Sequence, residues 1–91
     1  MKQVQFSAVF SGGTFGFAEF KLRRNGLLYT VFVIRGSGTN LLVLEPGLYL
    51  ISVQAVAPPG GAEITISEPT NPPTPDFFDE GPIFKSYVLS I

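Results

Sequence analysis

Residues 20–34, FKLRRNGLLYTVFVI, carry the strongest indication of fold in this chain. Asn25-Gly26 lies between two apolar runs, and this dipeptide favours a type I′ turn because both central residues of that turn need positive φ. We therefore expect residues 14–22 and 27–34 to form a β-hairpin. Residues 27–34 are apolar on both faces, which is typical of a strand at the centre of a sheet, covered on both sides by protein or by a partner subunit.

The rest of the chain repeats this pattern of short apolar runs separated by Gly, Pro and Asn. Strands are predicted over residues 3–10, 14–22, 27–34, 41–44, 48–56, 62–67 and 83–91. Phe15 and Phe17 share one face of their strand, whereas Phe20 and Leu22 share the other, so we expect at Ala18 a β-bulge or a strand that changes partners. About seven strands without helical periodicity predict an all-β fold, a small antiparallel β-sandwich or jelly roll.

A proline-rich segment, residues 68–76, interrupts the pattern. Its four prolines remove backbone donors, so it is predicted to be a stiff, extended loop that joins no sheet. We interpret it as a surface connection, or alternatively as an arm that contacts a partner. Because only about one strand follows, residues 1–91 are expected to form a single domain. That last strand has no polar tail, which favours a central place in a sheet or a place at an interface.

The composition restricts the chemistry that the chain can perform. Without Cys or His, it lacks thiolate and imidazole ligands and the commonest general base. Asp76, Asp79 and Glu80 could supply oxygens to a hard cation, but we favour a solvated loop with two phenylalanines anchored in the core, because the EF-hand pattern is absent. The other carboxylates that could form a catalytic pair are expected to be solvated surface groups: Glu19, Glu45, Glu63 and Glu68. We predict no enzyme activity, metal or cofactor.

A short basic stretch, Lys21, Arg23 and Arg24, lies close to several phenylalanines, a combination that also occurs in nucleic-acid-binding faces. A net charge of −1 gives no positive field to attract nucleic acid or an anionic membrane, so we favour an exposed hairpin tip. No apolar run is long enough to span a bilayer, and the first residues lack a signal-peptide pattern. We expect no nucleic-acid binding, no membrane insertion and, if Met1 is the natural start, synthesis in the cytoplasm.

The apolar content is high for so short a chain. Hydrophobic residues make up 45% of the 91 residues, and the mean hydropathy is +0.33. Because a β domain of this length has a small interior, part of this content is expected to be buried against other chains. The predicted contacts come from strands 27–34 and 83–91, through Val31, Phe32, Ile34, Tyr87, Leu89 and Ile91.

Three segments resemble the trimeric jelly rolls of the complement and tumour-necrosis-factor type. KLRRNG (residues 21–26) is similar to their hairpin, LVLEPGLYL (42–50) to their turn between two apolar strands, and residues 77–89 to their final strand near the trimer axis. The chain is shorter than such a domain, so a hairpin or more would be missing. PGLY (46–49), followed by alternating residues, is equally similar to short immunoglobulin-like or transthyretin-like bacterial modules.

The first resemblance implies a non-enzymatic structural protein: a homotrimer that decorates or extends a larger assembly, such as the capsid, tail or fibre of a bacteriophage. Such a protein is made in the host cytoplasm and contacts other structural proteins of the virion. The second resemblance implies an adhesion or carbohydrate-binding module of a larger bacterial surface protein, which is the alternative if Met1 is not the natural start. Neither family has a catalytic site that could be transferred to this chain.

Overall fold

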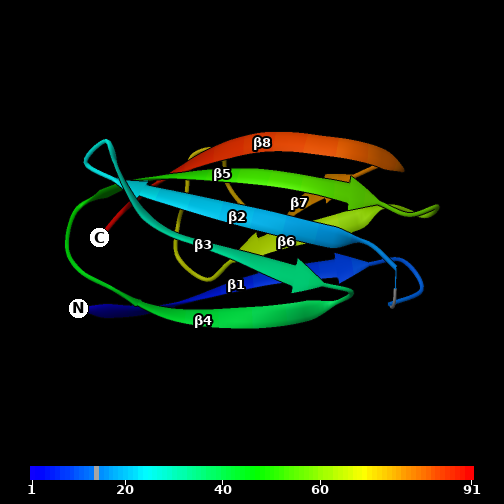
Figure 1. Ribbon diagram of the computed structural model, residues 1–91, viewed down its shortest axis with the longest axis horizontal. Helices are drawn as coiled ribbons and strands as arrows, with labels where there is room; N and C mark the ends of the chain where they lie inside the picture. Colours follow the sequence, from blue (N-terminus) through cyan, green and yellow to red (C-terminus); the bar gives the residue numbers. More distant parts are fainter. Residues whose placement is uncertain (14) are drawn as a thin grey trace.

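A computed structural model describes residues 1–13 and 15–91, and its regular structure consists of β-strands (Figure 1). The strands are β1 (Lys2–Phe10), β2 (Phe17–Arg24), β3 (Leu27–Arg35), β4 (Gly38–Leu44), β5 (Leu48–Ala57), β6 (Ala62–Ile66), β7 (Asp76–Phe78) and β8 (Gly81–Ser90). They form two four-stranded antiparallel sheets: sheet A, in the order β4-β1-β6-β7, and sheet B, in the order β3-β2-β5-β8. The prediction of a small all-β sandwich is confirmed.

The core lies between the two sheets and follows the alternation of each strand. Along β5, for example, Tyr49, Ile51, Val53 and Ala55 are buried, whereas the residues between them are exposed or half-buried. The surface area of the chain is 5062 Å², close to the roughly 5,200 Å² expected of a folded monomer of this mass. The chain therefore closes a complete core by itself.

An aromatic cluster of two core residues and the half-buried Phe32 joins the two sheets. Phe20 of β2 and Phe32 of β3 stack with their ring centroids 5.0 Å apart. Phe6 of β1, in the other sheet, meets these two rings edge-on at 5.9 and 5.4 Å. Such offset and edge-to-face pairs contribute about 0.5–1.5 kcal/mol each beyond the apolar area that they bury.

The β2–β3 hairpin forms at the predicted turn. Asn25 and Gly26 have φ angles of 51° and 86°, as a type I′ turn requires. The bulge predicted near Ala18 is wrong, because Ala18 pairs with Ile34 in regular register and the shift occurs between Leu22 and Arg23. The predicted strand also began too early: β2 starts at Phe17, and Thr14 lies outside the described residues.

Two predictions about strand position are corrected. Residues 27–34 were expected at a sheet centre, but β3 is an edge strand that pairs only with β2, and its outer face is uncovered within the chain. The last strand, β8, is the other edge of sheet B, so a central place for it is wrong, whereas the alternative, a place at an interface, stays a prediction. Hydrophobicity on both faces of a strand therefore does not establish that the strand's own chain covers both faces.

The segment between β6 and β7 is an extended loop, as predicted, with one exception. Asn71, which has a backbone N–H, forms a bridge with Val88: its N–H donates to the Val88 carbonyl at 3.0 Å, and the Val88 N–H donates back at 2.8 Å. The loop therefore covers part of the free edge of β8. The sequence also missed β7, Asp76–Phe78, which pairs with β6.

Candidate interaction surface

The outer face of sheet B carries most of the exposed apolar side chains of the described residues. These side chains come from all four strands and point away from the core, because outward positions alternate with buried ones. They are Phe17, Leu28, Val31, Val33, Leu48, Leu50, Val56, Phe84 and Val88. A surface of this kind marks an interaction site more often than scattered single apolar residues do.

A polar stripe crosses the middle of this face. Glu19 and Lys21 of β2 lie opposite Gln54 and Ser52 of β5 in the strand register. Together with Phe84 of β8, these residues line a shallow groove. Apolar side chains thus surround a centre of mixed charge and hydrogen-bonding groups, which suits the surface of another protein better than a single small ligand.

An apolar hollow lies at the end of the face near the β2–β3 turn. Leu48, Leu50 and Val88 line it, with Arg23 and Gly26 beside them. The side chains of Leu48 and Leu50 are 54% and 40% exposed, so a partner would still gain from covering them.

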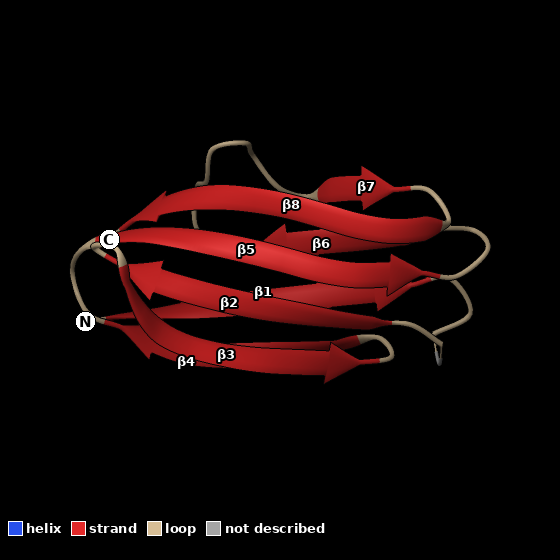
Figure 2. Cartoon of the chain, turned by 45° about the horizontal axis from the view of Figure 1, so that its top comes forward, coloured by secondary structure: helices blue, strands red, loops and turns tan. Residues whose placement is uncertain are grey.

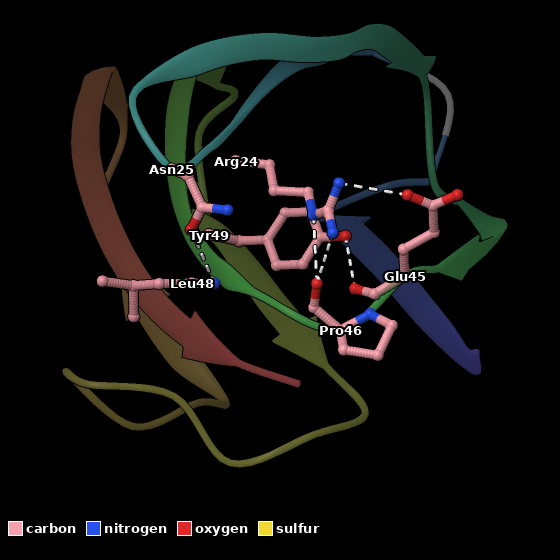
Figure 3. Close-up of polar contacts among 6 residues, drawn as sticks. All are labelled: Arg24, Asn25, Glu45, Pro46, Leu48 and Tyr49. Carbon is pink, nitrogen blue, oxygen red and sulfur yellow. Dashed lines mark hydrogen bonds and ion pairs between the residues drawn. The ribbon is translucent and has the colours of Figure 1, made fainter.

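A hydrogen-bonded cluster holds the backbone next to this hollow (Figure 3). The buried Tyr49 donates its hydroxyl hydrogen to the Glu45 carbonyl at 2.6 Å. Arg24 donates from Nε and Nη2 to the Pro46 carbonyl, at 3.1 and 2.7 Å, and its Nη1 lies 3.0 Å from the Glu45 carboxylate. Burial, with a smaller contribution from Tyr29, raises the pKa of Tyr49 above its ordinary value. The cluster joins the β2–β3 turn to the β4–β5 connection.

The basic stretch of the hairpin is divided between two environments. Lys21 and Arg23 point outward on β2, whereas Arg24 belongs to the end cluster just described. Of the phenylalanines close to them in sequence, Phe20 is buried in the core and Phe17 shares the outer face, on which Phe84 of β8 also lies.

The acidic segment at residues 76–80 does not converge on one point. Asp76 accepts a hydrogen bond from the Tyr87 hydroxyl at 2.9 Å and lies 3.7 Å from Lys85 Nζ. Burial, with the hydrogen bond to Asp76 as the next cause, raises the pKa of Tyr87 above its usual value. Asp79 and Glu80 are exposed in the β7–β8 turn. Of the two phenylalanines expected to anchor this segment, Phe78 packs on the core and Phe77 is 70% exposed.

The remaining glutamates are dispersed over the molecule. Glu45 and Glu68 each form an ion pair, the latter with Lys2 at 2.8 Å. Glu19 lies on the outer face of sheet B and Glu63 on that of sheet A. Within residues 1–13 and 15–91, no group of three or more acids, histidines or cysteines is placed to hold a metal ion.

The six predicted interface residues lie in three different environments: exposed, buried in the core, and half-buried against the core. Val31 points outward and is 43% exposed. Ile34, Tyr87 and Leu89 are buried in the core of the chain itself, so their side chains cannot reach a partner. The other two, Phe32 and Ile91, are half-buried against that core. The strands are therefore at the surface, but the outward positions are their neighbours on the other face.

The alternation of residues along β8 indicates which of its side chains point outward. On β8, Ile83, Tyr87 and Leu89 share one face, and Phe84 and Val88 share the opposite one. The more apolar face of a two-faced strand is normally the core face, so this alternation favours Phe84 and Val88 as the outward residues of β8.

The described residues contain no helix that is long and apolar enough to cross a membrane. Comparison of the chain with protein-family models, with curated proteins and with solved structures gave no match. A proposal for the function of this protein therefore rests on its own surface.

Proposed function

We propose that this chain is a non-enzymatic structural module that assembles with copies of itself through the outer face of sheet B. The observation that supports the proposal is the collection of exposed apolar side chains from all four strands of one sheet. The outer face of the opposite sheet is more polar: on its central strand β1, the outward residues Gln3, Gln5 and Ser7 are polar and the fourth, Val9, is apolar. The two outer faces are thus suited to different surroundings.

The energies favour a contact that covers much of the face. Burying the exposed part of such a Val, Leu or Phe side chain contributes roughly 1 kcal/mol, about half the value for full burial. Association costs about 4–15 kcal/mol in lost translational and rotational freedom. A contact through one or two side chains would therefore not persist, whereas one that covers most of the nine can.

The setting that we favour is a bacteriophage capsid, tail or fibre, as the jelly-roll resemblance implies. In that setting the chain decorates or extends the particle and contacts other structural proteins of the virion. The same resemblance implies three copies. A small β-only fold without cysteine suits such use, since assembly then depends on buried apolar β surface rather than on disulfides.

One observation favours the alternative, an immunoglobulin-like adhesion or carbohydrate-binding module. Tyr49 lies near the start of β5, just after the connection between the sheets, and its hydroxyl bonds to the carbonyl of Glu45, four residues upstream. This resembles the tyrosine corner of immunoglobulin-like sandwiches. A module of that class would be a monomer that uses its outer face on a different molecule.

A matched pair of substitutions tests the proposal. Phe84 on sheet B and Phe77 on sheet A are 73% and 70% exposed, so Phe84→Lys and Phe77→Lys remove equal apolar surface from opposite sides. The mass in solution is measured by light scattering over a dilution series. We expect the wild type to be an oligomer, Phe84→Lys to weaken it at least tenfold, and Phe77→Lys to leave it unchanged. A wild-type monomer, or equal effects of the two substitutions, would contradict the proposal and favour the alternative.

A further inference from the structure

Strand β4 is an edge strand with none of the usual protection against pairing. Natural edge strands are commonly shortened, bulged, covered, or marked by Pro or charge. β4 spans Gly38–Leu44, contains neither Pro nor a charged residue, and pairs with β1 in unbroken register from Ala8↔Gly38 to Lys2↔Leu44. Among the described residues, no segment other than β1 hydrogen-bonds to its backbone.

The other three edges of the sandwich are modified. β7 has three residues. β8 carries Pro82 and is bridged at Val88 by the proline-rich loop. β3 has a register shift that leaves Tyr29 without a partner on β2, since Leu22 pairs with Thr30 and Arg23 with Leu28. Of the four edge strands of the two sheets, β4 is therefore the one that carries no such modification.

The exposed apolar side chains of β4 are confined to that edge. Leu41 and Val43 point outward from sheet A and are 51% and 55% exposed. On the adjacent strand they lie beside Gln5 and Gln3, which are polar. An additional strand hydrogen-bonded to β4 would cover these two side chains and satisfy the free backbone groups in the same step.

The residues of β4 are suited to pairing with a second copy of β4. In an antiparallel pair centred on Leu41, this residue faces its own copy, and Thr39 faces Val43. No charge is placed opposite another within the strand, and the nearest charges in sequence lie beyond its two ends: Arg35, three residues before β4, and Glu45, just after it. The two ends of the strand differ in charge, so antiparallel pairing places the Arg35 end of one copy beside the Glu45 end of the other, whereas parallel pairing would place like ends together. Arg35 itself is the last residue of β3, and Glu45 also pairs with Arg24 of its own chain.

We propose that two copies of this chain pair antiparallel through β4, with a two-fold axis at Leu41, so that their A sheets form one continuous sheet. This contact rests on the proposed self-assembly and adds a second contact, at the edge of sheet A, to the one proposed for the outer face of sheet B. A two-fold contact uses the same patch on both copies and closes as a dimer. The edge therefore predicts an even number of copies, in contrast to the trimer that the resemblance implies.

Disulfide trapping tests this register directly, because the chain has no cysteine of its own. Opposite residues of an antiparallel pair have Cα atoms about 4.5–5.5 Å apart, within the roughly 4.4–6.8 Å range of a disulfide. Under mild oxidation we expect Leu41→Cys to become a covalent dimer almost completely. The control is Val9→Cys, which has the same 51% exposure on the outer face of the same sheet but lies on the central strand β1.

A second measurement checks the register. Thr39→Cys and Val43→Cys proteins should cross-link to each other when mixed and only weakly when each is alone. Cross-linking of Leu41→Cys at the level of Val9→Cys would overturn the pairing, and cross-linking of Thr39→Cys alone at the level of Leu41→Cys would overturn the register. If the wild type is an oligomer, such as a trimer, and Leu41→Cys does not cross-link, the pairing fails and the proposed function stands. If the wild type is a monomer at every concentration and Leu41→Cys does not cross-link, both fail.

Discussion

The two long sides of the sandwich differ in how their edge strands are protected against pairing (Figure 2). β3 and β4 lie together along one side, and β7 and β8 along the other (Figure 1). On the β7/β8 side, a short strand, Pro82 and the bridge from Asn71 cover or blunt the edges. On the β3/β4 side, β4 is bare, and two of its exposed side chains, Leu41 and Val43, are apolar. An unprotected edge strand can act as a template for pairing with another strand, and on this side of the molecule that edge is β4 rather than β3, which has a register shift.

The largest expected effect is on folding stability, and it differs between the core positions of β8 and the exposed positions of β4. Leu89 is 1% exposed, and Leu89→Asp would bury an unpaired carboxylate, at a cost comparable to the whole stability of about 5–15 kcal/mol. We expect this variant to have no cooperative thermal transition by circular dichroism. Leu41→Asp, at a side chain that is half exposed, should melt within a few degrees of the wild type. A folded, dissociated Leu89→Asp protein would show that β8 contacts a partner with its inward face.

The next effect concerns association. A lysine on an edge strand opposes the addition of another strand, so Leu41→Lys should weaken self-association at least tenfold, or about 1.4 kcal/mol. Its stability as a folded chain should change by about 0.5 kcal/mol or less. Val9→Lys removes an equally exposed side chain from the centre of the same sheet and is the control. Sedimentation velocity over a dilution series measures both variants, and equal behaviour of the two would remove the distinction between edge and centre.

On the β7/β8 side, the buried Tyr87 should make the folding stability of the chain sensitive to alkaline pH. The folded-state pKa of Tyr87 lies above its unfolded value of about 10, through burial first and then the hydrogen bond to Asp76. The corresponding stability is fully present below pH 10 and is lost as the pH rises from there towards the folded-state pKa. The loss is at most about 1.4 kcal/mol per pH unit for this group. The raised pKa of Tyr49 acts in the same direction.

Urea denaturation at pH 8 and pH 11 measures this loss. Tyr87→Phe should be less stable than the wild type at pH 8 and should lose less stability between the two pH values. Tyr29→Phe, which alters a side chain that is 38% exposed and leaves Tyr87 in place, should keep most of the alkaline loss. An unchanged pH dependence in Tyr87→Phe would show that the contact between β7 and β8 does not depend on this hydroxyl.

The smallest expected effect concerns the ion pair beside the same contact between β7 and β8. Lys85 Nζ lies 3.7 Å from the Asp76 carboxylate, and its side chain is 37% exposed. Ion pairs of this kind contribute about 0–1 kcal/mol because water and salt screen them. Lys85→Ala should therefore change the free energy of unfolding by less than about 0.5 kcal/mol in the same urea experiment. A larger loss would mean that the ion pair, rather than the tyrosine, fixes Asp76.

The sequence predicted those parts of the fold that depend on neighbouring residues. Asn25-Gly26 specifies its turn through backbone geometry alone, and the strands appear wherever apolar residues alternate between turn residues. β7 was missed because three residues give no alternation to detect. The Asn71 bridge was missed because it depends on where the loop lies beside β8, which no local pattern contains.

The candidate surface was harder to predict than the fold. Alternation shows that Tyr87 and Leu89 share a face, but the choice between core and interface needs the second sheet, which packs onto that face. The same limit applies to β3, whose apolar outer face looks identical in sequence whether its own chain or a partner covers it. For β4, the informative signal was an absence: seven residues without charge or proline, at an edge that only the strand order reveals.

The mass of the wild-type protein in solution tests the central claim most directly. The chain has a mass of 9.8 kDa, so light scattering coupled to size-exclusion chromatography distinguishes one copy from two or more. We predict a mass of at least two copies that persists on dilution through the micromolar range. A mass of 9.8 kDa at every concentration would contradict the account, because the chain would then leave both its apolar sheet face and its bare edge unpaired.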